Sequence, residues 1–228
     1  MVYDLTESRS GQHCRTFLGD WQSKLIYDDY AGYKACFDQG ITVLGCMAHA
    51  RRKFFEVFAS NKSPVAGHAL DSIKALYRIE RKAGRLKADD RRRLRQKRAV
   101  PILDALHVWL KQQRELVPPG SAIANAIDYS LRRWQALTRY VDDGHAVIDN
   151  NHCENLVRPV ELGRKNWLFA GSLRAGQRAA AVMSLIQSAV LNGHDPYAYL
   201  KDVLTRLPIT KHKDIGELLP HNWRPAQG

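Results

Sequence analysis

Two acidic residues far apart in the sequence are the first candidates for chemistry. Asp28 follows the short apolar segment KLIY (24–27), and Glu154 lies in VIDNNHCENLVRP (147–159), which is crowded with hydrogen-bonding side chains. A carboxylate at the carboxyl end of a strand lies where ligands and metals usually bind in open α/β sheets. An isolated Asp at such a place is more often an ordinary turn or helix cap. A second carboxylate close to Asp28 in space would favour metal binding.

Glu154 is the candidate for that second carboxylate. We expect it one turn into a helix, with Arg158 and Lys165 four and eleven residues further on and close to the same helical face. A carboxylate and two cations on one face could bind a metal ion and a phosphodiester together. They could equally be solvated ion pairs, and Asp149 and Glu154 could simply cap the helix N-terminus. Spacing alone does not decide between these interpretations.

Further candidates follow the predicted strand ITVLGC (41–46). Cys46 and His49 have the Cys-x-x-His spacing of metal ligands, but a structural zinc needs four ligands on suitable loops, so the pattern disfavours zinc. The adjacent cations Arg51, Arg52 and Lys53 are better explained as phosphate contacts. The run RRRLRQKR (91–98) is either a second group of phosphate contacts or the solvated face of a long helix.

The overall charge favours a polyanionic partner. The 228 residues include 35 Lys and Arg against 23 Asp and Glu, a net charge of +12. Nucleic acid is the first expectation and an anionic membrane surface the second. No apolar run approaches the roughly 20 residues of a membrane-spanning helix, and no secretory signal opens the chain. The four scattered cysteines are typical of reduced thiols, so we expect a cytoplasmic protein with no membrane partner.

Short apolar segments and longer amphipathic segments define the expected elements. Strands separated by helices at the beginning of the chain predict an α/β sheet. The expected strands there are 2–5, 24–27 and 41–46, with helices at 11–21 and 28–40. Helices are then expected at 47–60, 65–86, 89–116 and 121–141, followed by a kinked helix at 151–163, a strand at 166–171, and helices at 173–192 and 195–207.

Four blocks in a fixed order carry a family resemblance. They are LIYDDYAGYKA, GCMAHARRKF, IDNNHCENLVRPVELGRKNWLFAGS and SLIQSAVLNGHDPYAYLKDVLTRLP. Together they closely resemble the catalytic and C-terminal parts of bacterial transposases of the insertion sequence 66 family. The resemblance covers residues 2 to 223, nearly the whole chain.

The resemblance implies an α/β fold, a partial RNase H-like fold interrupted by a large all-helical insertion and followed by a helical C-terminal segment. In this scheme residues 1–46 form a partial sheet from the third strand onward, and residues 47–141 form the insertion. Residues 142–172 return to the catalytic core with the helix that bears Glu154, and residues 173–228 form the C-terminal helical segment.

The resemblance also implies a chemistry, that of a transposase with a DDE carboxylate triad. Asp28 and Glu154 would be catalytic residues and metal ligands, with Asp28 preferred to Asp29 because family members commonly have glycine at the second position. Two Mg²⁺ ions (or Mn²⁺) would activate the attacking oxygen and stabilise the leaving oxygen during DNA cleavage and strand transfer. The implied DNA contacts are His49, Arg51, Arg52, Lys53, Arg158, Arg164 and Lys165.

One departure from the family pattern limits these expectations. The family's first aspartate is expected upstream of the residues present here, so we expect weak metal binding and little or no cleavage by this chain alone. Unpaired strand edges predict self-association. Binding to duplex DNA should be mostly nonspecific and strongly salt-dependent. The alternatives are a catalytically inactive DNA-binding or interaction fragment, such as a remnant of a decayed transposon, and a general Mg²⁺ nuclease.

Overall fold

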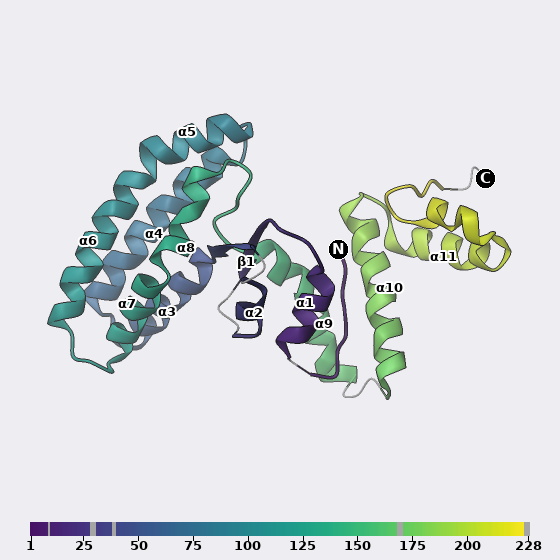
Figure 1. Cartoon of the computed structure of the whole chain (residues 1–228), viewed down its shortest axis with the longest axis horizontal. Coiled ribbons are helices and arrows are strands. Elements are labelled where there is room, and N and C mark those ends of the chain that lie inside the picture. Colours follow the sequence, from purple (N-terminus) through teal and green to yellow (C-terminus); the bar gives the residue numbers. More distant parts are fainter. Residues whose placement is uncertain (9, 28–30, 38–39, 168–170, 226–228) are drawn as a thin grey trace. The chain divides into compact units, whose positions relative to one another are not determined.

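The chain divides into two units in its computed structural model, which describes residues 1–8, 10–27, 31–37, 40–167 and 171–225. The larger unit is Ser10–Glu154, and the smaller unit joins Met1–Arg9 to Asn155–Gly228. Helices make up most of what is described in both units (Figure 1).

The larger unit contains a parallel pair of strands, β1 (Lys24–Tyr27) and β2 (Thr42–Gly45). Lys24 lies opposite Thr42 and Tyr27 lies opposite Gly45. A Cβ atom on Gly45 would come within 2.9 Å of the Leu137 side chain, so β2 packs directly against the helical part of this unit. Both strands lie where the sequence predicts them. The other elements before β2 are α1 (Gly11–Leu18), the 3₁₀ helix η1 (Ala31–Tyr33) and α2 (Lys34–Phe37).

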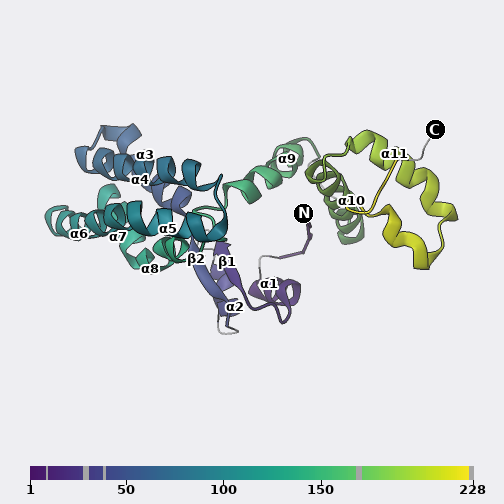
Figure 2. The ribbon, with the colours of Figure 1, turned by 90° about the horizontal axis from the view of Figure 1, so that it is seen from above.

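Residues 47–142 of the larger unit are helical and contain no strand. Serine caps begin two of the helices: Ser63 Oγ accepts a hydrogen bond from the amide of Ala66 at 3.3 Å, and Ser121 Oγ accepts one from Ala124 at 3.2 Å. Figures 1 and 2 show these helices packed beside one another. They are α3 (Met47–Asn61), α4 (Pro64–Ala83), α5 (Ala88–Arg98), α6 (Val100–Leu116), α7 (Ala122–Arg132), α8 (Trp134–Thr138) and the 3₁₀ helix η2 (Arg139–Asp142).

The core of the larger unit lies between α3, α4, α6 and α7. Phe54, Leu76, Leu110 and Ile127 each expose 1% or less of their surface, and each comes from a different one of these helices. Leu44 of β2 joins the same core. Burial of apolar side chains from four helices at once explains why this region folds together, since burial of each such side chain contributes about 1.5–3 kcal/mol.

A buried arginine from the basic run 91–98 links α5 to the rest of this unit by hydrogen bonds. Arg95 is 1% exposed, and it donates to both carboxylate oxygens of Glu80 on α4, at 2.9 and 2.6 Å. Its Nη1 donates to the carbonyls of Tyr140 and Asp143 at 3.0 and 2.7 Å. Arg91 likewise donates to the carbonyls of residues 83, 86 and 144. These two arginines of the run are therefore structural and are neither phosphate contacts nor part of a solvated face.

The smaller unit is built from helices and has a small aromatic core. Ala189, Tyr199, Val203, Leu218 and Trp223 form the buried cluster. The Tyr199 hydroxyl donates to the Leu218 carbonyl at 2.8 Å, and the Trp223 indole donates to Asp202 at 2.7 Å. The helices are α9 (Asn151–Trp167, whose first turn belongs to the larger unit), α10 (Leu173–Leu191), α11 (Pro196–Arg206), and the 3₁₀ helices η3 (Leu207–Ile209) and η4 (His212–Leu218).

The predicted α/β fold with a partial RNase H-like sheet is wrong, because the described chain is mostly helical and its sheet has only two strands. The expected strand at 2–5 does not pair with the sheet. Instead the amide of Tyr3 donates to Ser184 on α10 at 2.8 Å, and its hydroxyl donates to the carbonyl of Leu156. At the expected strand 166–171, Asn166 and Trp167 continue α9, and residues 168–170 lie outside the described residues.

Candidate functional site

The turn before Glu154 is fixed to the start of α3 and the side of α4. The Ile148 carbonyl accepts a hydrogen bond from the amide of Met47, the first residue of α3, at 3.0 Å. Asn150 Oδ1 accepts from the thiol of the completely buried Cys46 at 2.9 Å. Asp149 Oδ2 accepts from the hydroxyl of Tyr77 on α4 at 2.5 Å. Three consecutive residues of the turn are thus held by groups about 70 to 100 positions away in the chain.

Asp149 also starts α9. Its Oδ1 accepts from the amide of Asn151 at 3.1 Å, and its Oδ2 accepts from the Asn151 side-chain amide at 2.9 Å. The amide of Glu154 donates to the Asn150 carbonyl at 3.0 Å, which closes the first turn of the helix. The capping role that the sequence left open therefore belongs to Asp149, while the Glu154 side chain makes none of these bonds.

Both donors that hold the turn stay protonated at neutral pH. Burial raises the pKa of the Cys46 thiol above its usual range. Burial, together with the hydrogen bond to Asp149, raises the pKa of the Tyr77 hydroxyl far above its usual value. Because each group acts as a donor only while it carries its proton, these shifts preserve the bonds to Asn150 and Asp149.

The Glu154 carboxylate lies beside two side chains of α3. Its Oε1 is 3.4 Å from His49 Nε2, and its Oε2 is 3.7 Å from Arg52 Nη2. The Glu154 and Arg52 side chains are 35% and 56% exposed, and His49 is 17% exposed. Nδ1 of His49 is buried and has no hydrogen-bond partner in the described part of the chain. The structure thus brings together three predicted site residues: an accessible carboxylate, an imidazole and a guanidinium.

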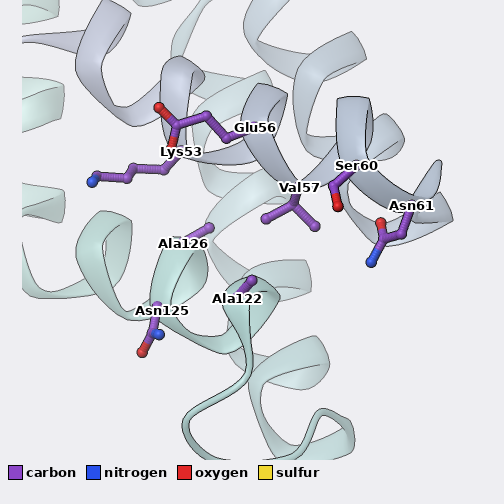
Figure 3. Close-up of a pocket in the computed structure, with 8 residues that line it drawn as sticks. All are labelled: Lys53, Glu56, Val57, Ser60, Asn61, Ala122, Asn125 and Ala126. Carbon is purple, nitrogen blue, oxygen red and sulfur yellow. The ribbon is translucent and has the colours of Figure 1, made fainter.

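The other predicted DNA contacts on α3 lie on different sides of the helix. Arg51 is positioned over the ring of Phe55, 5.6 Å from its centroid. Lys53 lines a pocket between α3 and α7, together with Glu56 of α3 and Asn125 of α7 (Figure 3). The three adjacent cations of the sequence therefore do not converge on one point.

The remaining predicted site residues are only partly described. Asp28 lies outside the described residues, so its proximity to Glu154 stays a prediction. Arg158 is exposed on α9 and belongs to the smaller unit, while for Arg164 and Lys165 only the helical backbone is described. Within the residues that are described, no group of three His, Cys, Asp or Glu side chains could hold a metal ion.

Sequence reasoning missed Tyr77 as a residue that fixes the site. It lies in the middle of α4, and no local pattern distinguishes it from an ordinary partly buried tyrosine. Its relation to Asp149 depends on how α4 packs against the turn, which only the folded chain shows.

A separate finding concerns membranes: no described helix is both long and apolar enough to cross one.

Comparisons with known proteins match two successive parts of the sequence, and the division between these parts falls within α10 and not between the two units. A family model described as "Transposase IS66 family" matches residues 1–178, and one described as "IS66 C-terminal element" matches residues 184–221. No solved structure matches the chain.

Similar proteins come from Sinorhizobium fredii (strain NBRC 101917 / NGR234). The uncharacterized proteins y4hP and y4jD are each 36% identical over 99% of this chain, which covers 44% and 46% of their lengths. The uncharacterized protein y4qI is 32% identical over 99% of this chain, which covers 43% of its length. The chain thus spans less than half the length of these relatives. With one family model matching most of its residues, the chain belongs to the IS66 family of transposases.

Proposed function

We propose that this chain is part of a transposase that cleaves and joins DNA strands, with Glu154 as one of the carboxylates at the reaction site. The observation that carries the proposal is the fixed position of Glu154 between His49 and Arg52, at the end of a turn held by three hydrogen bonds. Membership of a transposase family and the net charge of +12 support DNA as the substrate.

Mg²⁺ or Mn²⁺ fits Glu154 by the chemistry of its donor atoms. Hard cations prefer carboxylate oxygens, and the two neighbours of Glu154 lie beyond the length of a strong charge-assisted hydrogen bond, so its oxygens can exchange to a metal. Asp28 is the second ligand in this proposal. The bound metal would activate the attacking oxygen and stabilise the leaving oxygen of the phosphodiester.

The protein side chains around Glu154 have separate roles in this proposal. Arg52 is the most exposed of the three and binds a phosphate oxygen of the DNA, which also offsets the charge of the carboxylate. His49 holds the Glu154 carboxylate from the buried side. We propose further phosphate contacts from Arg51, Lys53, Arg158, Arg164 and Lys165.

Self-association of the chain stays a prediction, which light scattering on a size-exclusion column would check.

The test measures Mn²⁺ binding by electron paramagnetic resonance, which does not require turnover. We expect Glu154→Gln to weaken Mn²⁺ binding at least about tenfold, since a lost outer-shell partner alone typically costs that much. Glu161→Gln makes the same change at an exposed position of the same helix, and its affinity should equal that of the unsubstituted chain. Equal affinities for the two variants would contradict the role of Glu154.

Cleavage of labelled duplex DNA with Mg²⁺ or Mn²⁺ is assayed on the same samples. Any metal-dependent cleavage should disappear in Glu154→Gln and persist in Glu161→Gln. Cleavage that survives in Glu154→Gln would contradict the proposal. DNA binding combined with Mn²⁺ binding that is independent of Glu154 would instead support the alternative of a DNA-binding fragment without catalysis.

A further inference from the structure

The outer face of α4 carries four cations that the local sequence does not group into a run. Lys74, Arg78, Arg81 and Lys82 are all exposed. At 3.6 residues per turn they fall within an arc of about 100° around the helix. The buried residues of α4, among them Ile73 and Leu76, lie on the opposite side. Packing of the apolar side against the core therefore turns all four charges outward.

None of these four charged side chains forms an ion pair or hydrogen bond with the part of the chain that the structure describes. Arg81 and Lys82 lie in the last turn of α4, where cations also interact favourably with the helix dipole. That effect is confined to the last turn and does not account for Lys74 and Arg78.

The basic run on α5 differs from this arrangement in two ways. Its exposed cations Arg92, Arg93, Lys97 and Arg98 spread over an arc of about 240° around the helix, so they do not face one surface. Arg93 is also paired with Asp90 at 3.2 Å. The run that is conspicuous in the sequence is thus dispersed in space, whereas the spaced cations of α4 form one stripe.

The α4 stripe, defined as Lys74, Arg78, Arg81 and Lys82, adjoins the candidate site. Tyr77 lies about 60° around α4 from Lys74 and holds Asp149 in the turn before Glu154. Arg51 of α3 is near enough to Tyr77 that its charge opposes the rise of the tyrosine pKa caused by burial and by Asp149. Exposed positive charge thus lies on α3 at Arg52, beside Glu154, and on the face of α4 next to Tyr77, which holds the turn before Glu154.

We propose that the α4 stripe binds the phosphate backbone of duplex DNA whose cleavage site lies at Glu154. The stripe spans about 12 Å along the helix axis, a length over which duplex DNA carries about seven phosphates. Contacts from a helix face to phosphates position DNA without reading its sequence. This inference rests on the proposed function and adds a second, distinct contact surface to it.

The experiment measures the salt dependence of DNA binding by fluorescence anisotropy, with a labelled duplex of arbitrary sequence. One variant replaces the α4 stripe (K74Q, R78Q, R81Q, K82Q), and the matched control replaces the α5 cations (R92Q, R93Q, K97Q, R98Q). Both lose four charges, so a general effect of net charge is the same in each. If all four stripe residues contact phosphates, the slope of log K against log salt should shrink by about 3.6.

The control should keep a slope close to that of the unsubstituted chain. Equal slopes for the two variants, or an unchanged slope for the α4 variant, would overturn the inference. Circular dichroism checks folding, and if the fourfold variant unfolds, each single replacement should still lower the slope by about 0.9.

Mn²⁺ binding separates this inference from the proposed function. The α4 variant should bind Mn²⁺ as the unsubstituted chain does, because it leaves Glu154 unchanged. If the α4 variant keeps the salt slope of the unsubstituted chain while Glu154→Gln still weakens Mn²⁺ binding, the role of the α4 stripe is refuted and the proposed function is not. Absence of DNA binding by the unsubstituted chain refutes both.

Discussion

The two units of the chain are stabilised in different ways. In the described residues the largest connected core of the larger unit contains twenty buried side chains, drawn from one strand, its helices and the turn before α9, whereas that of the smaller unit contains five. The smaller core relies on the polar ends of its aromatic residues: Tyr199 and Trp223 each pack on the other, with ring centroids 5.4 Å apart, and each donates a hydrogen bond.

This difference shows what a small core requires. Apolar area alone stabilises a small unit only marginally, because little surface is removed from water. Buried aromatic rings add large areas, and their polar groups must find partners when they are buried. We therefore expect single hydrogen bonds to matter in the smaller unit. In the larger unit, stability should be most sensitive to the pairing of Arg95, the one fully buried charged side chain among its described residues.

The largest effect is expected from Glu80→Ala in the larger unit. It leaves the Arg95 guanidinium buried without its carboxylate partner, which should lower the free energy of unfolding by about 3–5 kcal/mol. Hydrogen exchange in increasing urea, read on peptides of α4 and α5, measures this change. Asp90→Ala breaks the exposed pair with Arg93 and should cost at most about 1 kcal/mol. Similar losses for both variants would contradict the importance of the buried charge.

An intermediate effect is expected from Tyr199→Phe in the smaller unit. The ring remains, but the buried Leu218 carbonyl loses its donor, which should cost about 1–2 kcal/mol in peptides of α10 and α11. Tyr197→Phe removes the same hydroxyl from a residue that is 75% exposed, and it should change stability by less than about 0.5 kcal/mol. Equal stability of the two variants would contradict the conclusion that the smaller core depends on its hydrogen bonds.

The smallest effect concerns the pH dependence of the same core. The hydrogen bond from Trp223, followed by that from Arg206, holds the pKa of the Asp202 carboxyl below its usual 3.8. Because the folded pKa is lowered, this stabilisation is complete above pH 3.8 and is lost as the pH falls further, through the folded pKa. The NMR signal of the Trp223 indole N–H should titrate with a midpoint below 3.8. A midpoint at or above 3.8 would contradict the prediction, and Asp202→Asn should abolish the titration.

Local sequence patterns predicted many elements but not their assembly. The apolar segments 24–27 and 41–46 are strands as expected, and helices occupy most of 47–141. The helix expected at 89–116 is two helices, α5 and α6, which meet at Ala99. Pro101 in the first turn of α6 was a usable signal, because proline favours the start of a helix.

The segment VYDL (2–5) shows why short apolar segments mislead. Its β-branched, aromatic and aliphatic residues fit a strand, but a strand also needs a neighbouring strand to satisfy its backbone groups. Here the serines 184 and 188 of α10 supply hydrogen bonds to the backbone and terminus of residues 1–3. That partner lies more than 180 positions away in the chain, beyond the reach of any local pattern.

The residues of the candidate site could be predicted where they lie close together in the sequence or in the blocks that carry the family resemblance. His49, Arg52 and Glu154 were all predicted, and the structure places them together. The dispersal of Arg51 and Lys53 from them follows from helix geometry, since adjacent helical residues point about 100° apart. The structural role of Arg95 depends on Glu80 and on carbonyls of a later segment, so it could not be read from the basic run.

The bonds that join Cys46 and Met47 to Ile148 and Asn150 have a topological consequence. The hundred residues between these points leave the site and return to it at the same place, so they form a closed loop. The entropy of closing a loop grows only with the logarithm of its length, by about 0.6 kcal/mol for each doubling. The helical segment can therefore lengthen or shorten beyond α3 and α4 at little entropic cost, while its two ends and Tyr77 keep Glu154 beside His49.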